Sequence, residues 1–227
     1  MLFRSIFASG SVQYAGQPMF AVVATSYDAA RRAALLGRAD ITPLPAILDA
    51  RDAIAQQSFV LPSVSFVRGD PDAAMARATQ RLQGSFAVGG QEHFYLEGQV
   101  AAALPQEDGG VLVHSSTQHP SEIQHLVAHA LRLPAHQVTV QCRRLGGGFG
   151  GKESQPALFA AVAALAAIRL GRAVKLRIDR DTDMRITGKR HDFIADWSAG
   201  FDDEGRIAAF DVMIDRKSTR LNSSHSD

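Results

Sequence analysis

This 227-residue chain holds a single cysteine, Cys142, so it cannot form an internal disulfide. That scarcity fits a reducing compartment, and we expect a cytoplasmic protein. The chain also lacks an excess of positive or negative charge, because its formal net charge is only +1. This balance gives no reason to expect nucleic acid or a membrane surface as a partner. The apolar run at 157–168 is too short for a bilayer and predicts a buried helix instead. Residues 1–10 lack the apolar core of a signal peptide.

What the sequence does contain is the balance of an ordinary globular protein, with 46% hydrophobic and 21% charged residues. Apolar periodicity and turn residues predict mixed helices and strands with a hairpin turning at 202–205, and therefore an α+β (mixed α/β) fold. The expected helices are 27–36, 49–56, 120–131 and 156–170, with another starting at Asp70-Pro71. The expected strands are 17–24, 82–88, 94–104, 111–113, 138–141, 174–178, 193–201 and 206–214.

Five glycines and one phenylalanine at residues 146–151, called the glycine loop below, form the most distinctive segment. Glycine loses more backbone entropy on folding than any other residue, so such a cluster predicts that something packs against bare backbone. The loop follows an expected strand and precedes an expected helix, where backbone N–H groups can receive an anion.

Three explanations from local chemistry remain open for this loop. A phosphate loop would need a serine or threonine hydroxyl where Glu153 stands, so the carboxylate argues against it. Gly146, Gly148 and Gly151 match the G-x-G-x-x-G pattern of a dinucleotide-binding loop, and Asp179 is a candidate ribose ligand. This explanation leaves Phe149 without a role. A plain glycine turn would let the helix pack closely on the strand.

Three blocks of sequence stand out together. They are Gly-Gly-Gly-Phe-Gly-Gly-Lys-Glu at 146–153, Gly-Gly-Gln-Glu-His-Phe-Tyr-Leu-Glu at 89–97 and Thr-Gln-His-Pro-Ser-Glu-Ile-Gln at 117–124. In content, order and spacing they resemble the xanthine dehydrogenase family, the molybdenum hydroxylases, with a match from about residue 11 to about residue 214. The chain is most similar to the molybdenum-binding (large) subunit of bacterial members.

The resemblance implies a molybdenum–molybdopterin cofactor, held through the pterin's own dithiolene, so that no Cys/His metal cluster is required. In xanthine-oxidising members it implies hydroxylation of hypoxanthine and xanthine to urate by a molybdenum hydroxide, with hydride transfer. It further implies a hetero-oligomer with a small subunit that carries 2Fe-2S clusters and FAD, and NAD as the electron acceptor. The protein's own part is binding, orientation and electrostatics.

The resemblance also assigns roles to five residues. Gln91 would donate its amide to an oxo ligand of molybdenum, which a carboxylate cannot do. The ring of Phe149 would form one wall of the site, and its backbone would lie near the metal. The N–H groups of Gly148, Phe149 and Gly150 would face the cofactor. Glu153 would contact the purine ring opposite the reacting carbon and stabilise charge in the transition state. Aldehyde oxidases carry an apolar residue there, so Glu153 favours xanthine and hypoxanthine.

Local chemistry offers plainer roles for the same positions. Gln91 could be a turn glutamine paired with backbone, Phe149 a core anchor and Glu153 an acid at a helix N-terminus. We expect Lys152 to face solvent or to pair locally, and residues 180–185 to form a charged surface loop.

The resemblance divides the chain into parts. Residues 6–57 correspond to the C-terminal part of an α/β hammerhead domain, and 58–214 to the N-terminal part of the molybdopterin-binding domain. We interpret residues 1–5 and 215–227 as foreign tips, because both resemble translated sequencing adapters. The natural sequence would then be a fragment of a longer subunit whose catalytic glutamate and substrate-binding arginine lie downstream. We therefore expect the isolated chain to be inactive.

Three classes of function remain open. A molybdenum hydroxylase, including aldehyde oxidase and other heterocycle dehydrogenases, predicts that Gln91, Phe149 and Glu153 converge on one wall. A Rossmann-type dinucleotide-binding protein predicts further βα units on a parallel sheet. A noncatalytic α/β interaction module predicts no common concave surface.

Overall fold

The computed structural model describes residues 6–216, which divide into two compact units. Among these residues, the first unit comprises 6–42 and 92–189, and the second comprises 43–91 and 190–216. Each unit combines helices with strands, so the predicted α+β fold is confirmed. The tips interpreted as foreign, apart from residues 215 and 216, lie outside the described residues. No helix of the described chain is long and apolar enough to span a membrane.

The first unit is built on a four-stranded sheet in the order β4-β3-β2-β5. Strand β2 (Val100–Pro105) runs antiparallel to both β3 (Val111–Ser115) and β5 (Val174–Arg177). Only β3 and β4 (Val138–Gln141) are parallel. A doubly wound dinucleotide-binding domain needs a largely parallel sheet, so this topology contradicts the Rossmann-type hypothesis.

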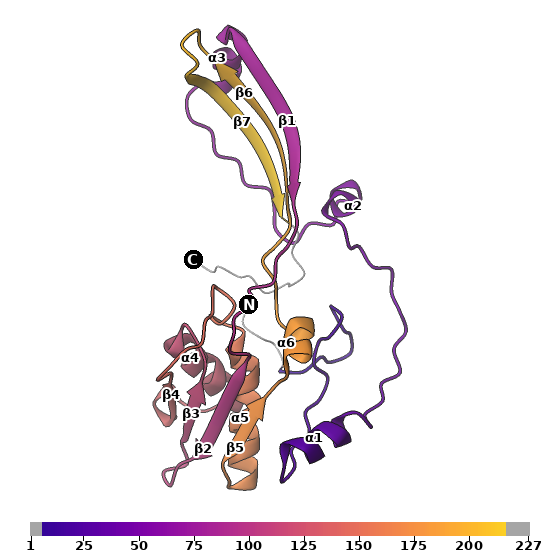
Figure 1. Cartoon of the computed structure of the whole chain (residues 1–227), viewed down its shortest axis with the longest axis vertical. Helices are drawn as coiled ribbons and strands as arrows, with labels where there is room; N and C mark the ends of the chain where they lie inside the picture. The colour runs from indigo at the N-terminus through magenta and orange to yellow at the C-terminus, as the bar shows by residue number, and fades with distance from the viewer. Residues whose placement is uncertain (1–5, 217–227) are drawn as a thin grey trace. The chain divides into compact units, whose positions relative to one another are not determined.

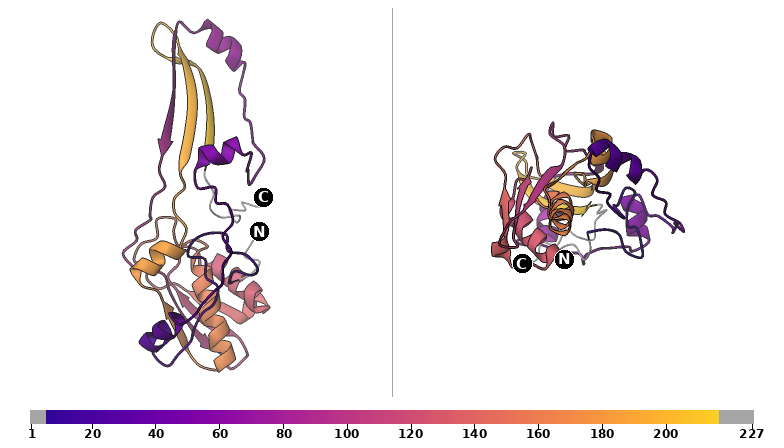
Figure 2. Two further views of the ribbon diagram at one scale, coloured as in Figure 1. Left: turned by 90° about the vertical axis from the view of Figure 1, so that its right-hand side faces the viewer. Right: turned by 90° about the horizontal axis from the view of Figure 1, so that it is seen from below.

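Helices α4 (Pro120–Leu131) and α5 (Pro156–Leu170) cover this sheet, as Figure 1 and the view from below in Figure 2 show. Helix α5 packs on β2, β3 and β5 and also on α4, and its buried positions surround most of its circumference. Alanine supplies most of those positions, and its small side chain lets the helix lie close to the sheet. The core of the first unit therefore lies between the sheet and these two helices.

Two shorter helices also belong to the first unit. The side chain of Ser26 accepts a hydrogen bond from the backbone of α1 (Tyr27–Ala34), as expected for an N-cap. Asp179 caps α6 (Arg180–Ile186) in the same way and forms a 3.4 Å ion pair with Arg31 of α1. The unit also contains the 3-10 turn η1 (Ala135–Gln137) between α4 and β4.

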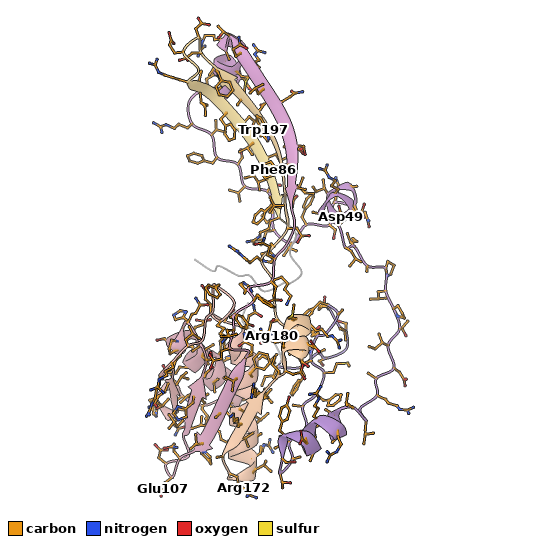
Figure 3. All side chains as sticks on the ribbon, viewed as in Figure 1. Asp49, Phe86, Glu107, Arg172, Arg180 and Trp197 are labelled. Atoms are coloured by element: carbon orange, nitrogen blue, oxygen red, sulfur yellow. The ribbon has the colours of Figure 1, made fainter. Side chains whose placement is uncertain are left out.

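The second unit is a three-stranded antiparallel sheet in the order β1-β6-β7. Its strands are β1 (Gln80–Val88), β6 (Phe193–Phe201) and β7 (Ile207–Arg216). The expected hairpin turn joins β6 to β7, with the Asp202 N–H donating to the Arg206 carbonyl at 3.0 Å. Helices α2 (Ala50–Ala55) and α3 (Pro71–Arg77) belong to this unit, and α3 packs on β6 and β7. Figure 3 labels Phe86 on β1 and Trp197 on β6.

Several expected elements differ in the structure. Residues 17–24 form no strand, and 94–104 is a strand only from Val100 onward. Phe94 has a φ of +50°, which a strand does not allow at that position. Its ring lies 5.6 Å from the guanidinium of Arg180, which Figure 3 labels. The expected surface loop at 180–185 is helix α6, and β7 runs on to residue 216.

Candidate functional site

The glycine loop lies between β4 and α5 and packs tightly against residues 93–97. A Cβ atom at Gly146 would lie 2.5 Å from the Cβ of Glu97, closer than real side chains approach. A Cβ at Gly151 would lie 2.8 Å from ring atoms of both His93 and Tyr95. The sequence therefore needs glycine at these two positions because other parts of the protein touch the bare backbone.

Phe149 is the exception within this loop. Its φ is +54°, a left-handed conformation that is unusual for a bulky aromatic residue. Phe149 is 72% exposed, so it does not anchor the core of the first unit as its local chemistry suggested. Strained backbone and an exposed aromatic ring together are typical of a ligand-binding position.

Gln118, between β3 and α4, holds the far end of the glycine loop. Its side-chain oxygen accepts hydrogen bonds from the N–H groups of Gly150 at 3.0 Å and Lys152 at 3.2 Å. Its own N–H donates to the Lys152 carbonyl at 2.7 Å, and the Thr117 hydroxyl donates to the same carbonyl at 2.9 Å. These bonds fix which way the amide nitrogen of Gln118 faces, because its oxygen is already committed to the loop.

Lys152 corrects a prediction. We expected it to face solvent or pair locally, yet it is fully buried. Its ammonium donates to the Glu97 carbonyl at 2.6 Å, the Ser116 hydroxyl at 2.8 Å and the Glu97 carboxylate at 3.3 Å. It also lies 4.6 Å from the centre of the Tyr95 ring. A buried ammonium needs partners on all three N–H groups, and here residues distant in sequence provide them.

A second buried network lies beside Lys152. The Tyr95 hydroxyl donates to the Asp183 carboxylate at 2.7 Å, and the same carboxylate accepts from the Gln99 backbone N–H at 2.7 Å. The Gln99 side chain then donates to the Tyr95 hydroxyl at 3.0 Å and to the Gly151 carbonyl at 3.2 Å. This network ties the glycine loop to α6, the helix that carries Asp183.

The environment shifts three pKa values in this region. Burial lowers the pKa of the Lys152 ammonium, although the Glu97 carboxylate opposes that effect. Burial acts to raise the pKa of Glu97, but hydrogen bonds from Ser116 and Gly146 outweigh it and, with Lys152, lower that pKa. Burial and the hydrogen bond to Asp183 raise the pKa of the Tyr95 phenol. The site therefore favours a charged Glu97 and a neutral Tyr95.

The middle of the glycine loop leaves backbone donors uncommitted. Within residues 6–216, the N–H groups of Gly147, Gly148 and Phe149 donate no hydrogen bond, and Gly148 is a buried residue. Buried backbone donors are rarely left without an acceptor in a protein. Three successive free N–H groups fit a ligand that presents oxygen atoms or negative charge to the loop.

The structure locates the predicted site residues in different units. Gly148, Phe149, Gly150 and Glu153 follow one another in the first unit, and Glu153 is exposed. Gln91 belongs to the second unit, where its backbone exchanges hydrogen bonds of 3.1 and 2.9 Å with Arg190. The expected convergence of Gln91 with Phe149 and Glu153 therefore stays a prediction. The Gly150 N–H, expected to face the cofactor, donates to Gln118.

Sequence reasoning missed Gln118, Glu97 and Lys152 as parts of this site. Gln118 and Glu97 lie inside the blocks that carried the family resemblance, so the signal was present, but only long-range contacts reveal their roles. Within the described range, no group of three or more His, Cys, Asp or Glu residues could hold a metal ion.

Fold and loop together describe a ligand-binding module of the α+β class. A sequence profile of the molybdopterin cofactor-binding domain family matches residues 54–219, and this chain belongs to that family. Xanthine dehydrogenase of Drosophila subobscura is 44% identical over 209 residues, which cover 91% of this chain and 16% of that protein. Aldehyde oxidase 2 of Cavia porcellus is 40% identical over 210 residues, covering 92% of this chain and 16% of that protein.

A solved structure shares the fold. Quinoline 2-oxidoreductase of Pseudomonas putida 86 aligns with a TM-score of 0.80 at 24% identity, over 91% of this chain and 27% of that chain. The resemblance to the molybdenum hydroxylases is therefore confirmed. Because the chain spans only 16% of the length of these curated relatives, which include both a xanthine dehydrogenase and an aldehyde oxidase, the choice of substrate is a separate question.

Proposed function

We propose that this chain supplies part of the molybdopterin site of a molybdenum hydroxylase that oxidises hypoxanthine and xanthine. The observation that carries the proposal is the row of free N–H groups at Gly147, Gly148 and Phe149, one of them on a buried residue. A bound molybdenum–molybdopterin cofactor would supply the oxidation of a ring carbon. The chain's own residues would bind that cofactor, orient the purine and exclude water.

Each residue of the loop has a distinct part in this proposal. The free N–H groups would donate to acceptors on the cofactor, and the exposed ring of Phe149 would cover the reacting centre against water. Glu153 would hold a proton shared with a ring nitrogen of the purine and so stabilise charge that builds on the ring. The carboxylate of Glu153 is the reason for proposing a purine instead of an aldehyde.

A glutamine amide would donate to an oxo ligand, and two glutamines are candidates. Gln91 is the one that the sequence resemblance assigned. Gln118 is favoured by geometry, because its oxygen is held by the glycine loop itself; the amide nitrogens of both glutamines donate no hydrogen bond within residues 6–216. In contrast, the side-chain oxygen of Gln91 accepts from Arg190 at 3.4 Å in the second unit.

We further propose the partners that the family resemblance implies. They are a small subunit with 2Fe-2S clusters and FAD, with NAD as the final electron acceptor, in a cytoplasmic hetero-oligomer. Because the chain covers 16% of its curated relatives, it would act as one portion of a larger enzyme, and the isolated chain would not turn over.

The substrate proposal is tested by changing Glu153 in the assembled enzyme. Glu153→Val should lower kcat/KM for xanthine by about 100-fold or more, as expected when one transition-state contact is lost. Turnover of an aromatic aldehyde should fall much less or rise. Unchanged xanthine turnover in Glu153→Val would overturn the purine proposal while leaving the cofactor proposal standing.

The glutamine assignment is tested with a matched pair. Gln118→Ala and Gln91→Ala are compared for molybdenum bound per chain and for turnover, with the distant, exposed Gln106→Ala as a control. We expect Gln118→Ala to lose turnover while Gln106→Ala resembles the wild type. A loss confined to Gln91→Ala would restore the assignment from sequence.

A further inference from the structure

We propose that Lys152 and Glu97 form a charged clamp that joins the two ends of the glycine loop and positions its free N–H groups for the cofactor. This inference rests on the proposed function, because the loop is taken to be the cofactor's contact. Lys152 and Glu97 are positioning residues here, since each acts through the backbone of the loop.

The first arm of the clamp holds the start of the loop. The Glu97 carboxylate accepts a hydrogen bond from the Gly146 N–H at 2.8 Å, and the Glu97 backbone N–H donates to the Gly146 carbonyl at 3.1 Å. Gly146 is therefore held on both its donor and its acceptor. The missing side chain at Gly146 is what allows Glu97 to approach so closely.

The second arm holds the end of the loop. Lys152 directly follows the last glycine, and its ammonium returns to the carbonyl and carboxylate of the same Glu97. Ser116 lies between the two charges, donating to the Glu97 carboxylate at 2.6 Å and accepting from Lys152 at 2.8 Å. One residue, Glu97, thus sets the separation between Gly146 and Lys152.

The span between these two anchors contains the free donors. Residues 147–149 make no backbone donation within the described chain, while the residues on either side of them are held by side chains. An internal bond, from the Gly151 N–H to the Gly148 carbonyl at 2.8 Å, shapes the loop but leaves the N–H groups of residues 147–149 free. A loop fixed at both ends presents its donors in one arrangement, which lowers the entropy lost on binding.

A charged pair suits this task better than an apolar pair would. Burying Lys152 carries a large desolvation cost, which its three hydrogen bonds and the Tyr95 ring offset. If the loop shifted, the ammonium would lose partners inside the protein, so alternative loop conformations are strongly disfavoured. The clamp therefore acts on the conformation of the loop more than on overall stability.

The first test measures the loop without any cofactor. Amide hydrogen exchange of residues 143–153 is followed in the purified full chain for Lys152→Met, Glu97→Gln and Glu97→Ala. We expect exchange in this segment to speed up by about tenfold or more, with α5 and the β2–β3 pair unchanged. Glu97→Gln should be less severe than Glu97→Ala, because the amide oxygen can still accept from Gly146.

A matched control separates this effect from general loss of an ion pair. Lys189 pairs with Glu92 in the same unit, and its ammonium also donates to Thr187, outside the glycine loop. Lys189→Met should leave exchange at 143–153 at the wild-type rate. Equal acceleration in Lys152→Met and Lys189→Met, or acceleration spread evenly over the whole unit, would overturn the clamp.

The second test uses the assembled enzyme and separates the clamp from the proposed function. We expect Glu97→Gln to lower the molybdopterin bound per chain, while Lys189→Met binds the wild-type amount. Fast exchange together with full cofactor binding would mean that the clamp exists but does not serve the cofactor, and the inference would fail. If the wild-type enzyme holds no molybdopterin, the proposed function fails, whatever the exchange rates show.

Discussion

The buried hydroxyl of Tyr95 offers a quantitative test of the network beneath the glycine loop. Tyr95→Phe removes one oxygen atom and keeps the ring that Lys152 contacts. The Asp183 carboxylate then loses its 2.7 Å donor but keeps the Gln99 N–H at 2.7 Å. The single proton of the Thr187 hydroxyl goes to the Asp183 backbone carbonyl at 2.6 Å. The Gln99 side chain keeps its bond to the Gly151 carbonyl. The substitution therefore removes the hydrogen bond to the Asp183 carboxylate and the one that the Gln99 side chain donates to the hydroxyl, and each partner keeps another bond.

The size of the effect follows from these remaining contacts. A hydrogen bond to a charged group contributes about 1.5–3 kcal/mol. Because the Asp183 carboxylate keeps the Gln99 N–H as a donor, we expect Tyr95→Phe to lower the free energy of unfolding by about 2 kcal/mol. With a urea m-value of about 2–3 kcal/mol/M, the unfolding midpoint should fall by about 0.7–1 M.

The assay is urea unfolding of the purified chain, followed by far-ultraviolet circular dichroism. Tyr27→Phe is the control, because Tyr27 is 50% exposed and should change stability by less than about 0.5 kcal/mol. Equal midpoints for Tyr95→Phe and the wild type would refute the reasoning. A changed m-value would instead indicate a different unfolded state or loss of two-state behaviour.

The alkaline pH dependence provides a second check on the same residue. The pKa of Tyr95 is raised in the folded chain, so the folded state favours the neutral phenol. Its contribution is fully present below the unfolded pKa, near about 10, and is lost as pH rises towards the higher folded value. Phenylalanine cannot ionise, so the stability difference between Tyr95→Phe and the wild type should narrow above about pH 10.

Two further substitutions test the helix cap and the second sheet. Asp179→Ala should cost about 1 kcal/mol because it removes the N-cap of α6. The Thr182 N–H and then Arg31 lower the pKa of Asp179, so its contribution is present above about pH 4 and disappears as pH falls through the lower folded value. Equal urea midpoints for Asp179→Ala and the wild type at neutral pH would contradict this role of Asp179. Gly84→Val should lower the free energy of unfolding by about 1–3 kcal/mol and shift the fluorescence of Trp197. The reason is that a Cβ added at Gly84 would lie 3.0 Å from the indole. Gln83→Val, on the opposite face, is its control, and identical emission from both variants would contradict the contact.

Local patterns predicted most elements of the fold. Three elements have the expected bounds: the helices at 120–131 and 156–170 and the strand at 138–141. Apolar spacing and an early proline mark the two helices. The run at 17–24 has the same local character as a strand, but it pairs with no strand of residues 6–216. A strand needs a partner, and the sequence of one segment cannot reveal it.

The chemistry beneath the loop was less predictable because its partners are far apart in sequence. Lys152 and Asp183 both belong to polar segments whose local patterns favour exposure, yet both are buried. Their partners, Glu97 and Tyr95, are more than fifty residues away. The family resemblance identified the loop itself, but which side chains hold it follows only from the fold.

The pairing of β1 with β6 has a consequence for how the chain folds. The two strands are neighbours in the second unit, yet residues 92–189, a segment of 98 residues, separate Gln91 from Arg190. Closing a flexible loop of that length costs about 4 kcal/mol of chain entropy. If the intervening segment condenses first and brings its ends together, most of that cost is removed before the strands meet. The mutual hydrogen bonds of Gln91 and Arg190 would then start a zipper that runs outward along β1 and β6. We therefore expect the sheet of the second unit to form late, after residues 92–189, which connect β1 to β6, have folded.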